Sequence, residues 1–361
     1  MKLTKFFALA LAALAFVGCG EPTPDGPDVK PTGNAVITAN NNSVEVNTPI
    51  EFTVTAADGT DLTAEAVIYD KSHDFVVVEN PFTPTIDGDY EFYAVIGSII
   101  TPSIKVSVVP TIPSLPEDNQ PENTAFNHRI LLVDHTGNTC GACPHMMKAL
   151  KTVSETGDYH SKYYEAMAHS YSSGDPAFSA AASMVSNLHG VSRYPTLTYN
   201  FYHETKSDGN AAHIMGQIDA LWKAEGADAG IAAAATLAST SVVVNTEVKA
   251  AVEGEYRITA WLLEDGIYAK QTNGTEEWMN THDNAIRQRI DSEHITGVDL
   301  GTIAVGETKD TALNLKIIGN KWNRDNLKVM VIVSAKNAKG LFEVANVAIC
   351  PVNDVVTYDY K

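Results

Sequence analysis

Hydrophobic and polar residues alternate in short runs along most of the chain, and a helical spacing interrupts this pattern only in the middle. Alternation with a period of two predicts strands that have one buried face. In the N-terminal third, for example, Tyr90, Phe92 and Ala94 alternate with more polar neighbours. Breakers such as Asp58-Gly59 separate the β-rich runs, which we place at Ala35–Thr38, Ser43–Val46, Ile50–Ala56, Ala66–Tyr69, Phe75–Glu79, Gly88–Ile96 and Ile104–Val109. Short strands at this spacing predict an immunoglobulin-like β-sandwich over residues 35–109.

The pattern changes over residues 128–228, where apolar strands alternate with helices. Predicted strands cover Arg129–Asp134, Tyr163–Ala168 and Tyr194–Tyr199. Predicted helices lie between and after them: one carries Met146, Met147, Leu150 and Val153, one is capped by Asp175 ahead of Pro176, and one covers Ala211–Ala224. This order predicts an α/β domain.

Residues 229–361 return to alternation, as in Tyr256, Ile258, Ala260 and Leu262. This predicts a second β-sandwich, in which the polar segment His282–Ile290 forms an insertion of helical character. Cys350 lies in a strand-like run and is expected to be a small buried residue. The predicted fold class is therefore multidomain α/β plus all-β, with an α/β domain flanked by two immunoglobulin-like sandwiches.

The N-terminus has the pattern of a lipoprotein export signal. A basic start is followed by the apolar run Phe6–Val17, which is too short to span a bilayer. We predict a signal peptide over residues 1–18 and lipidation of Cys19, followed by a Pro-rich tether over residues 19–34. Residues 110–127 hold four further prolines and are predicted to be a linker. These features predict a lipid-anchored outer-membrane lipoprotein, with either side of that membrane possible.

Charge narrows the possible partners. Among 361 residues, 44 acidic residues stand against 25 lysines and arginines, a formal net charge of −19. This excess disfavours binding to nucleic acid, because phosphate would be repelled. Four cysteines are too few for a disulfide-stapled miniprotein. We expect no cofactor and no bound metal, since the chain lacks a D-x-D-x-D-G calcium loop and a zinc-type histidine spacing.

The strongest chemical signal is Cys140-Gly141-Ala142-Cys143, which lies where a predicted strand meets a predicted helix. A C-x-x-C at such a junction is typical of a thioredoxin-like dithiol. The free N–H groups and the positive end of the helix dipole stabilise a thiolate there. Cys140 could then attack a disulfide, and Cys143 could resolve the mixed disulfide.

Two further features fit this template. Asp134 ends the strand six residues before Cys140, where thioredoxin has a buried acid that accepts the resolving cysteine's proton. Pro195 stands at the head of a later strand and resembles the cis-proline that faces the dithiol. That arrangement would leave the backbone of Tyr194 free to pair with an extended substrate. Simpler interpretations remain open: a permanent disulfide, an ordinary strand-end acid and a trans proline.

The segment Ile130–Pro144, ILLVDHTGNTCGACP, resembles the signature of the outer-membrane-protein-28 related lipoproteins. The segments Trp261–Asp265 and His282–Ile290 resemble the β-domain of the same family. The resemblance covers about residues 126–361 and implies a thioredoxin-like domain followed by a β-domain. It specifies the fold more closely than the activity. Thr139 and the Gly-Ala pair between the cysteines depart from thioredoxin itself.

These observations lead to two functional hypotheses. In the first, the protein is a thiol-disulfide oxidoreductase that acts on exported proteins or peptides bearing thiols or disulfides. In the second, it is a cell-surface binding or adhesion lipoprotein in which Cys140–Cys143 is a structural disulfide. Metal handling by the cysteines and nearby histidines, such as His135 and His145, is a weaker third hypothesis. The sequence specifies neither an oligomeric state nor the direction of exchange.

Overall fold

The computed structural model describes residues 33–201, 203–205, 209–319 and 321–361, and the described chain divides into two compact units after Val109. The predicted signal peptide and Cys19 lie outside the described residues. Within those residues, no helix is long and apolar enough to cross a membrane.

The first unit consists of short strands, as predicted. It contains β1 (Ala35–Ala39), β2 (Ser43–Glu45), β3 (Phe52–Ala56), β4 (Val67–Asp70), β5 (Val76–Val78), β6 (Gly88–Ile96), β7 (Ile99–Ile100), β8 (Ile104–Val109) and the 3-10 turn η2 (Thr63–Glu65). Each predicted strand is found within two residues of its expected bounds. β1 pairs with β3, while the other strands form one sheet in the order β2-β8-β6-β4-β5, with β7 on β6. Alternate side chains of these strands form a single core around Phe52 and Phe92.

The second unit, Pro110–Lys361, is also mostly β. Its N-terminal half contains β9 (Ile130–Thr136), α2 (Cys143–Glu155), η3 (Tyr159–Ser161), β10 (Tyr163–His169), α3 (Ala180–Leu188), β11 (Thr196–Tyr199), β12 (His203–Thr205) and α4 (Ala211–Leu221). Its C-terminal half contains β13 (Ala229–Leu237), β14 (Ser241–Ala250), β15 (Gly254–Glu264), β16 (Ile267–Tyr268), η4 (Glu277–Asn280), β17 (Thr281–His282), β18 (Ala285–Arg289), β19 (Val298–Ile303), β20 (Thr308–Lys316), η5 (Arg324–Asn326), β21 (Leu327–Lys336), β22 (Phe342–Pro351) and β23 (Asp354–Val356).

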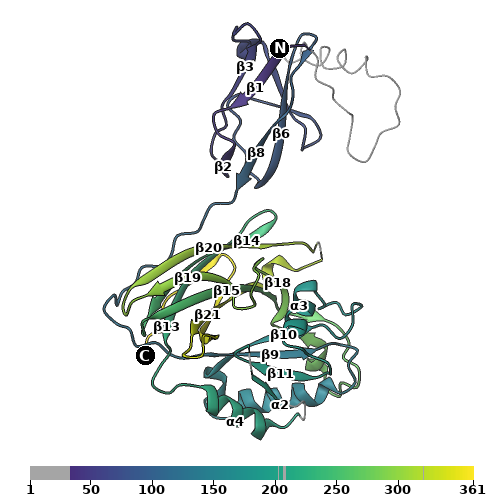
Figure 1. Ribbon diagram of the computed structural model, residues 1–361. Coiled ribbons are helices and arrows are strands. Elements are labelled where there is room, and N and C mark those ends of the chain that lie inside the picture. The colour runs from purple at the N-terminus through teal and green to yellow at the C-terminus, as the bar shows by residue number, and fades with distance from the viewer. Residues whose placement is uncertain (1–32, 202, 206–208, 320) are drawn as a thin grey trace. The chain divides into compact units, whose positions relative to one another are not determined.

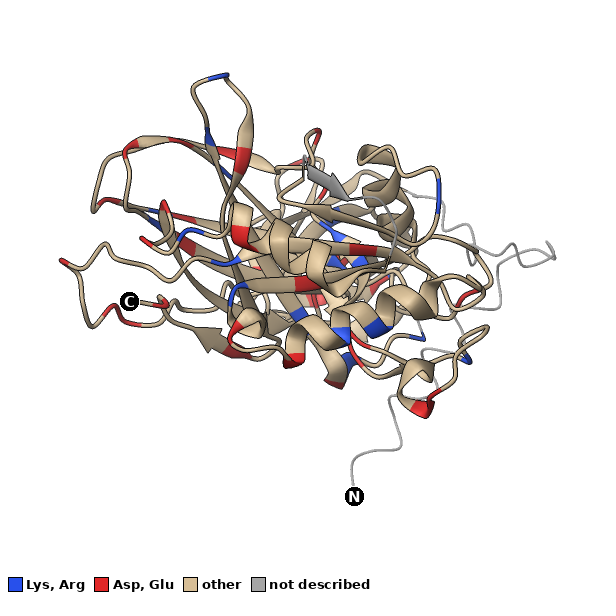
Figure 2. Ribbon diagram, turned by 90° about the horizontal axis from the view of Figure 1, so that it is seen from below, with Lys and Arg blue, Asp and Glu red and all other residues tan. Residues whose placement is uncertain are grey.

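β9 is the central strand of the α/β part, and all seven of its residues are buried. Side chains of Ile130 and Leu132 pack against α2 and α4, whereas Leu131 and Val133 pack on the opposite face with α3. Figure 1 shows α2 and α4 as the layer beneath β9 and β11. Burial on both faces explains why the sequence has a continuous apolar run here instead of an alternating one. Acidic and basic residues are interspersed along the outward-facing helices (Figure 2).

A single nine-stranded sheet runs through both halves of this unit, in the order β12-β11-β9-β10-β18-β15-β21-β22, with β19 on β15. The join is the parallel pairing of β10 with β18, where Met167 faces Ala285. The boundary predicted between residues 228 and 229 therefore does not coincide with a sheet edge. The fold class is mostly β with several sheets.

The expectation of a helical insertion at His282–Ile290 is wrong, because this segment forms β17 and β18. The polar residues of this segment suggested an insertion outside the sheet, but polar side chains of these strands are buried and paired. Arg287 forms an ion pair with Glu264 of the neighbouring β15, with Nε and Oε2 at 3.0 Å. A buried ion pair of this kind lets a polar strand occupy the middle of a sheet.

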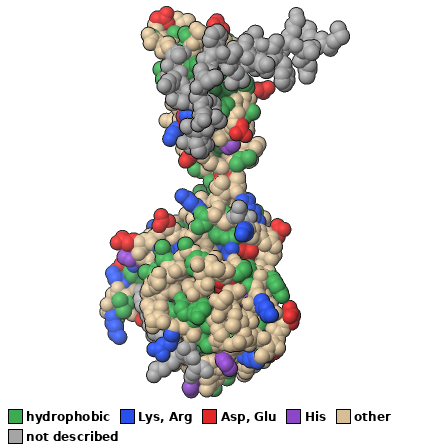
Figure 3. Space-filling model, turned by 90° about the vertical axis from the view of Figure 1, so that its right-hand side faces the viewer, with side chains coloured by type: hydrophobic (Ala, Val, Ile, Leu, Met, Phe, Trp, Pro, Cys, Tyr) green, Lys and Arg blue, Asp and Glu red, His purple; other side chains and the backbone are tan. Residues whose placement is uncertain are grey.

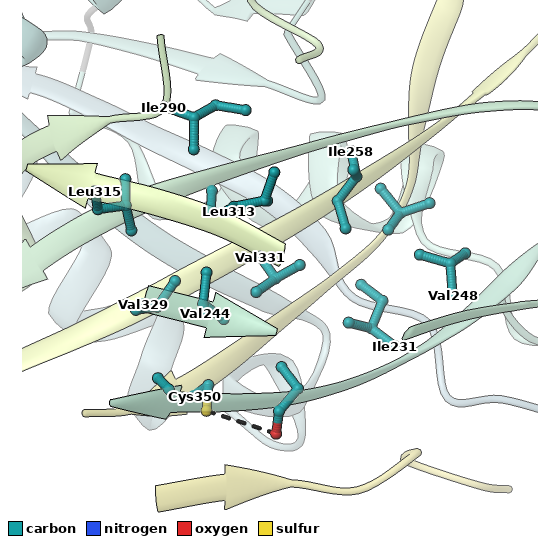
Figure 4. Close-up of a cluster of buried hydrophobic side chains, with 14 of the residues drawn as sticks. Ile231, Val244, Val248, Ile258, Ile290, Leu313, Leu315, Val329, Val331 and Cys350 are labelled. Atoms are coloured by element: carbon teal, nitrogen blue, oxygen red, sulfur yellow. Dashed lines mark hydrogen bonds between the residues drawn. The ribbon is translucent and has the colours of Figure 1, made fainter. Parts of the chain in front are cut away.

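β15, β21 and β22 also pack against a four-stranded sheet, β20-β14-β13-β23. Figure 4 shows the apolar side chains between the two sheets, including Ile258, Val331 and Cys350. Cys350 is fully buried, as expected, and burial raises the pKa of its thiol to about 11. A thiol that stays protonated in this core is a poor nucleophile.

Candidate redox site

Cys140 and Cys143 lie where the sequence places them, between the end of β9 and the start of α2. Cys143 is the first residue of α2, and Pro144 follows within the first turn, where no intrahelical donor is lost. The two cysteines form a disulfide, with Cα atoms 5.4 Å apart. Cys140 is only 2% exposed and Cys143 is fully buried. The motif therefore has the expected position, but both of its cysteines are almost completely buried.

Asp134 has the same orientation in β9 as Ile130 and Leu132, because side chains two residues apart share a face of a strand. That is the face on which α2 packs. Its carboxyl is fully buried, and neither oxygen has a hydrogen-bond partner among the described residues. Burial raises the pKa of Asp134 well above its usual value, and the carboxylate of Glu165 adds to this effect. Burial of Asp134 therefore favours the protonated form of its carboxyl over the charged form.

Pro195 precedes β11, and the Tyr194–Pro195 peptide bond is cis, which confirms that prediction. The phenolic oxygen of Tyr194 lies 3.0 Å from Ser170 Oγ, just after β10. Its ring also packs edge-on against Tyr171, at a centroid distance of 5.3 Å. Tyr171 is about half exposed. In Figure 3, hydrophobic side chains reach the surface among polar ones on the side of this unit where α3 lies.

His135 and His145, which flank the motif, have different environments. His135 is fully buried on the face of β9 opposite Asp134, with Nδ1 2.8 Å from Ser186 Oγ and Nε2 3.0 Å from Thr198 Oγ1. Burial, with a smaller contribution from the neighbouring His189, lowers the pKa of His135 to about 3. His145 is exposed on α2. No group of three or more potential ligands that could hold a metal ion occurs among the described residues.

A segment from the C-terminal half covers the cysteine loop, and sequence reasoning missed it completely. The side-chain amide of Gln271 donates to the carbonyl oxygens of Cys140, at 3.0 Å, and Gly137, at 3.3 Å. The backbone N–H of Thr272 donates to the carbonyl of Asn138 at 2.7 Å. Asn273 Nδ2 donates to the carbonyl of Gly141 at 3.0 Å. The chain separation of more than 130 residues left no sequence signal for these contacts.

The expectation that Asp175 caps a helix is also wrong, because α3 begins five residues later, at Ala180, and its cap is Ser179, whose Oγ accepts from the N–H of Ala182. Asp175 instead supports the cysteine loop. Its Oδ2 accepts from the N–H of Asn138 at 2.7 Å and lies 2.8 Å from Nδ1 of His169. Asp175-Pro176 has residues typical of a helix N-cap, but the carboxylate of Asp175 contacts Asn138 and His169, which lie earlier in the chain.

The fold and site define a mostly β protein with an α/β part that presents a C-x-x-C disulfide at the start of a helix. Residues 184–353 match the family described as Outer membrane protein Omp28. Over this region the chain is similar to the Omp28 family, which confirms the resemblance noted from the sequence. The match begins after the cysteine motif, so the motif itself lies outside it.

Solved structures show a related fold. HBP35 of Porphyromonas gingivalis superposes with a TM-score of 0.54 at 15% identity, covering 64% of this chain and 77% of that chain. At this identity the similarity concerns the fold alone. Domains 4–9 of the surface layer protein SbsC cover 91% of this chain and 52% of that chain at 10% identity, but the TM-score of 0.19 supports no argument. No curated protein sequence matches the chain.

Proposed function

We propose that this chain is a cell-envelope protein whose Cys140–Cys143 pair exchanges between disulfide and dithiol with exported proteins. The observation that carries the proposal is the position of Cys143 as the first residue of α2, directly after β9. A helix N-terminus stabilises a thiolate through its free N–H groups and its dipole. We assign this α/β part a thioredoxin-like fold and the first unit an immunoglobulin-like fold. The match of residues 184–353 to the Omp28 family supports an outer-membrane location.

The reaction begins from the disulfide that the structure contains. A thiolate of the partner attacks Sγ of Cys140, so a mixed disulfide forms and Cys143 leaves as a thiolate. The protonated carboxyl of Asp134, which burial favours, supplies the proton that this thiolate takes up. A second thiolate of the partner then attacks the partner's own sulfur in the mixed disulfide, which releases Cys140. Two electrons pass from two partner thiols to the cysteine pair, and the reverse sequence reduces a partner disulfide.

Tyr194 and Pro195 would present the partner. In this role the backbone of Tyr194 pairs with an extended segment, while the half-exposed ring of Tyr171 contacts its side chains. Lipidation at Cys19 would hold the protein at the outer membrane. The roles of Tyr194 and Pro195 and the lipidation of Cys19 are inferred from the sequence pattern. The partial exposure of Tyr171 beside Tyr194 is consistent with the role in presenting the partner.

The test measures the reduction potential of Cys140–Cys143 by equilibration with dithiothreitol buffers of graded potential. We expect a value between about −120 and −270 mV, the span of thiol-disulfide oxidoreductases, whereas structural bridges lie below about −300 mV. A Cys143→Ala variant should also accumulate mixed disulfides with envelope proteins. Cys350→Ala is the matched control, since its thiol is fully buried in another core. A potential below −300 mV together with no trapped partner would refute the exchange function.

A second candidate function is favoured by the burial of both cysteines, which is also typical of a structural bridge. In this alternative the chain is a surface binding or adhesion protein, and the disulfide only fixes the loop between β9 and α2. Its test is a Cys140→Ser/Cys143→Ser double variant, which should then retain partner binding. Loss of binding in a folded double variant would exclude this alternative.

A further inference from the structure

The segment that covers the cysteine loop is a closed hairpin, which we call the strap and define as residues Ala269–Trp278. It connects β16 to β17, which pair with each other. At its base, the N–H of Ala269 donates to the carbonyl of Asn280 at 2.9 Å, and the N–H of Gln271 donates to Asn280 Oδ1 at 2.9 Å. The strap therefore has a fixed base, while its contacts to the disulfide loop come from its tip.

The tip of the strap supplies only hydrogen-bond donors to the loop, and the loop supplies only carbonyl acceptors. One backbone N–H and two side-chain amides of the strap bind four carbonyls of the loop, as described above. Because a carbonyl cannot donate, the amide NH₂ of Gln271 must face the loop. Any molecule that replaced the strap would need donors at the same places. Backbone N–H groups and amide side chains of an extended polypeptide meet this requirement.

The closed strap leaves polar atoms unpaired, which favours opening. Gln271 Oε1 and Asn138 Oδ1 are buried and have no hydrogen-bond partner among the described residues. Nδ1 of His282, at the base of the strap, is also buried and has no hydrogen-bond partner among the described residues. A buried polar atom without a partner costs free energy that contact with water returns. Opening of the strap would expose these atoms together with the loop carbonyls.

The geometry points to the strap as a part of this chain that covers the surface to which an exchange partner would bind. We therefore infer that the strap must leave the loop before a thiolate can reach Cys140, and that the displacing partner is an extended polypeptide rich in N–H donors. This inference rests on the proposed exchange function, because it assigns a regulator and a partner class to that same site. On this inference, Cys140 and Cys143 are buried because the strap is closed over the loop, and the disulfide becomes reactive when the strap opens.

The test compares rates of disulfide reduction by dithiothreitol in the full chain, followed by alkylation and mass measurement. A Gln271→Ala/Asn273→Ala variant loses the side-chain hydrogen bonds of the strap to the cysteine loop, while the contacts of Lys148 with Thr275 and Glu276 remain. We expect its reduction rate to rise by about tenfold or more, since each lost hydrogen bond changes the opening equilibrium by a factor of several. Gln288→Ala is the matched control, because its amide donates to the carbonyl of Lys316 instead. The control should stay within twofold of the unmodified protein.

Gly141→Ala is a second variant that acts from the other side of the contact. Its added Cβ would lie 2.9 Å from Asn273 Nδ2, so the Asn273 side chain has to shift away from the carbonyl of Gly141. This variant keeps the inference testable if the double variant does not fold, and it should also accelerate reduction. Rates within twofold of the unmodified protein in the folded strap variants would overturn the inference.

The two proposals can fail separately. Dithiothreitol reduces the disulfide without any physiological partner, so faster reduction of the strap variants supports the strap inference even if Cys143→Ala traps no envelope protein. Conversely, trapped partners with no effect of the strap variants would retain the exchange function and refute the strap. Adding Gln271→Ala/Asn273→Ala to Cys143→Ala should increase the yield of trapped partner if both hold.

Discussion

Nδ1 of His169 lies 2.8 Å from Oδ2 of Asp175, and both side chains are fully buried. The same carboxylate holds the N–H of Asn138, whose carbonyl in turn accepts from Thr272 of the strap. The ring of His169 also packs edge-on against His282 at the base of the strap, at a centroid distance of 4.8 Å. One buried carboxylate therefore links β10, the cysteine loop and the strap.

Replacing Asp175 with alanine should destabilise the second unit strongly. The change removes three contacts of the carboxylate and leaves His169 and the Asn138 N–H unpaired, so we expect a loss of about 3 kcal/mol or more in urea unfolding. Asp158→Ala, at an exposed carboxylate, is the control and should cost less than about 1 kcal/mol. An Asp175→Ala protein as stable as the control would contradict this role.

The same carboxylate should make stability depend on acidity. Burial alone would raise the pKa of Asp175, but hydrogen bonds from His169, Asn138 and Ala177 outweigh it and leave the pKa below its ordinary value. The resulting stabilisation is present above the ordinary pKa of an aspartate and is lost as the pH falls through the lowered pKa. Urea unfolding between pH 6 and pH 3 should show a shallower loss in Asp175→Asn.

Asp134 should have the opposite pH dependence. Because burial raises its pKa, the carboxyl stabilises the fold while it is protonated, and this contribution is lost as the pH rises through the raised value. An Asp134→Asn protein should therefore gain stability relative to the unmodified protein between pH 5 and pH 9. Asp310→Asn, on the exposed side of β20, should show no such trend. A difference in stability that stays constant over this range would show that Asp134 is already ionised.

Local patterns predicted most elements, and long-range pairing accounts for the failures. The run Ile130–Val133, the helix start at Cys143 and the cis bond at Pro195 follow from signals within a few residues. Gln271 could not be predicted as a contact of Cys140, because its partners depend on how β16 and β17 are placed by distant strands. Likewise, the polar segment His282–Ile290 could not be predicted as strands, because Glu264, the partner of Arg287, lies on another strand.

Acid should also destabilise the protein through buried histidines. Burial lowers the pKa of His135 to about 3, so this imidazole stays neutral in the folded protein but takes up a proton below about pH 6.5 when unfolded. Stability is therefore present above pH 6.5 and lost as the pH falls below it. This group alone should cost about 2 kcal/mol at pH 5 relative to pH 8. His135→Asn should flatten the profile, while His145→Asn, at an exposed position, should not.

Lys249 of β14 anchors the Pro-rich segment that precedes β9. Its side chain is almost fully buried, with Nζ 3.0 Å from Asp118 Oδ2, 3.3 Å from the carbonyl of Gln120 and 3.2 Å from the hydroxyl of Tyr360. Nζ also donates to the carbonyl of Pro121. Residues predicted to be a linker thus belong to the second unit, where a buried cation holds them against β14.

A Lys249→Met protein should lose about 3–5 kcal/mol of stability, because the substitution removes the cation that pairs with Asp118 and leaves the carbonyls of Gln120 and Pro121 without this donor. The segment around Asp118 should then detach from the second unit and become accessible to proteases while the rest remains folded. Lys309→Met is the control, since Lys309 pairs in the neighbouring strand β20 but is exposed. Limited proteolysis followed by mass spectrometry locates the cleavage, and equal resistance of both variants would show that the aromatic packing of Tyr360, and not the ion pair, holds this segment.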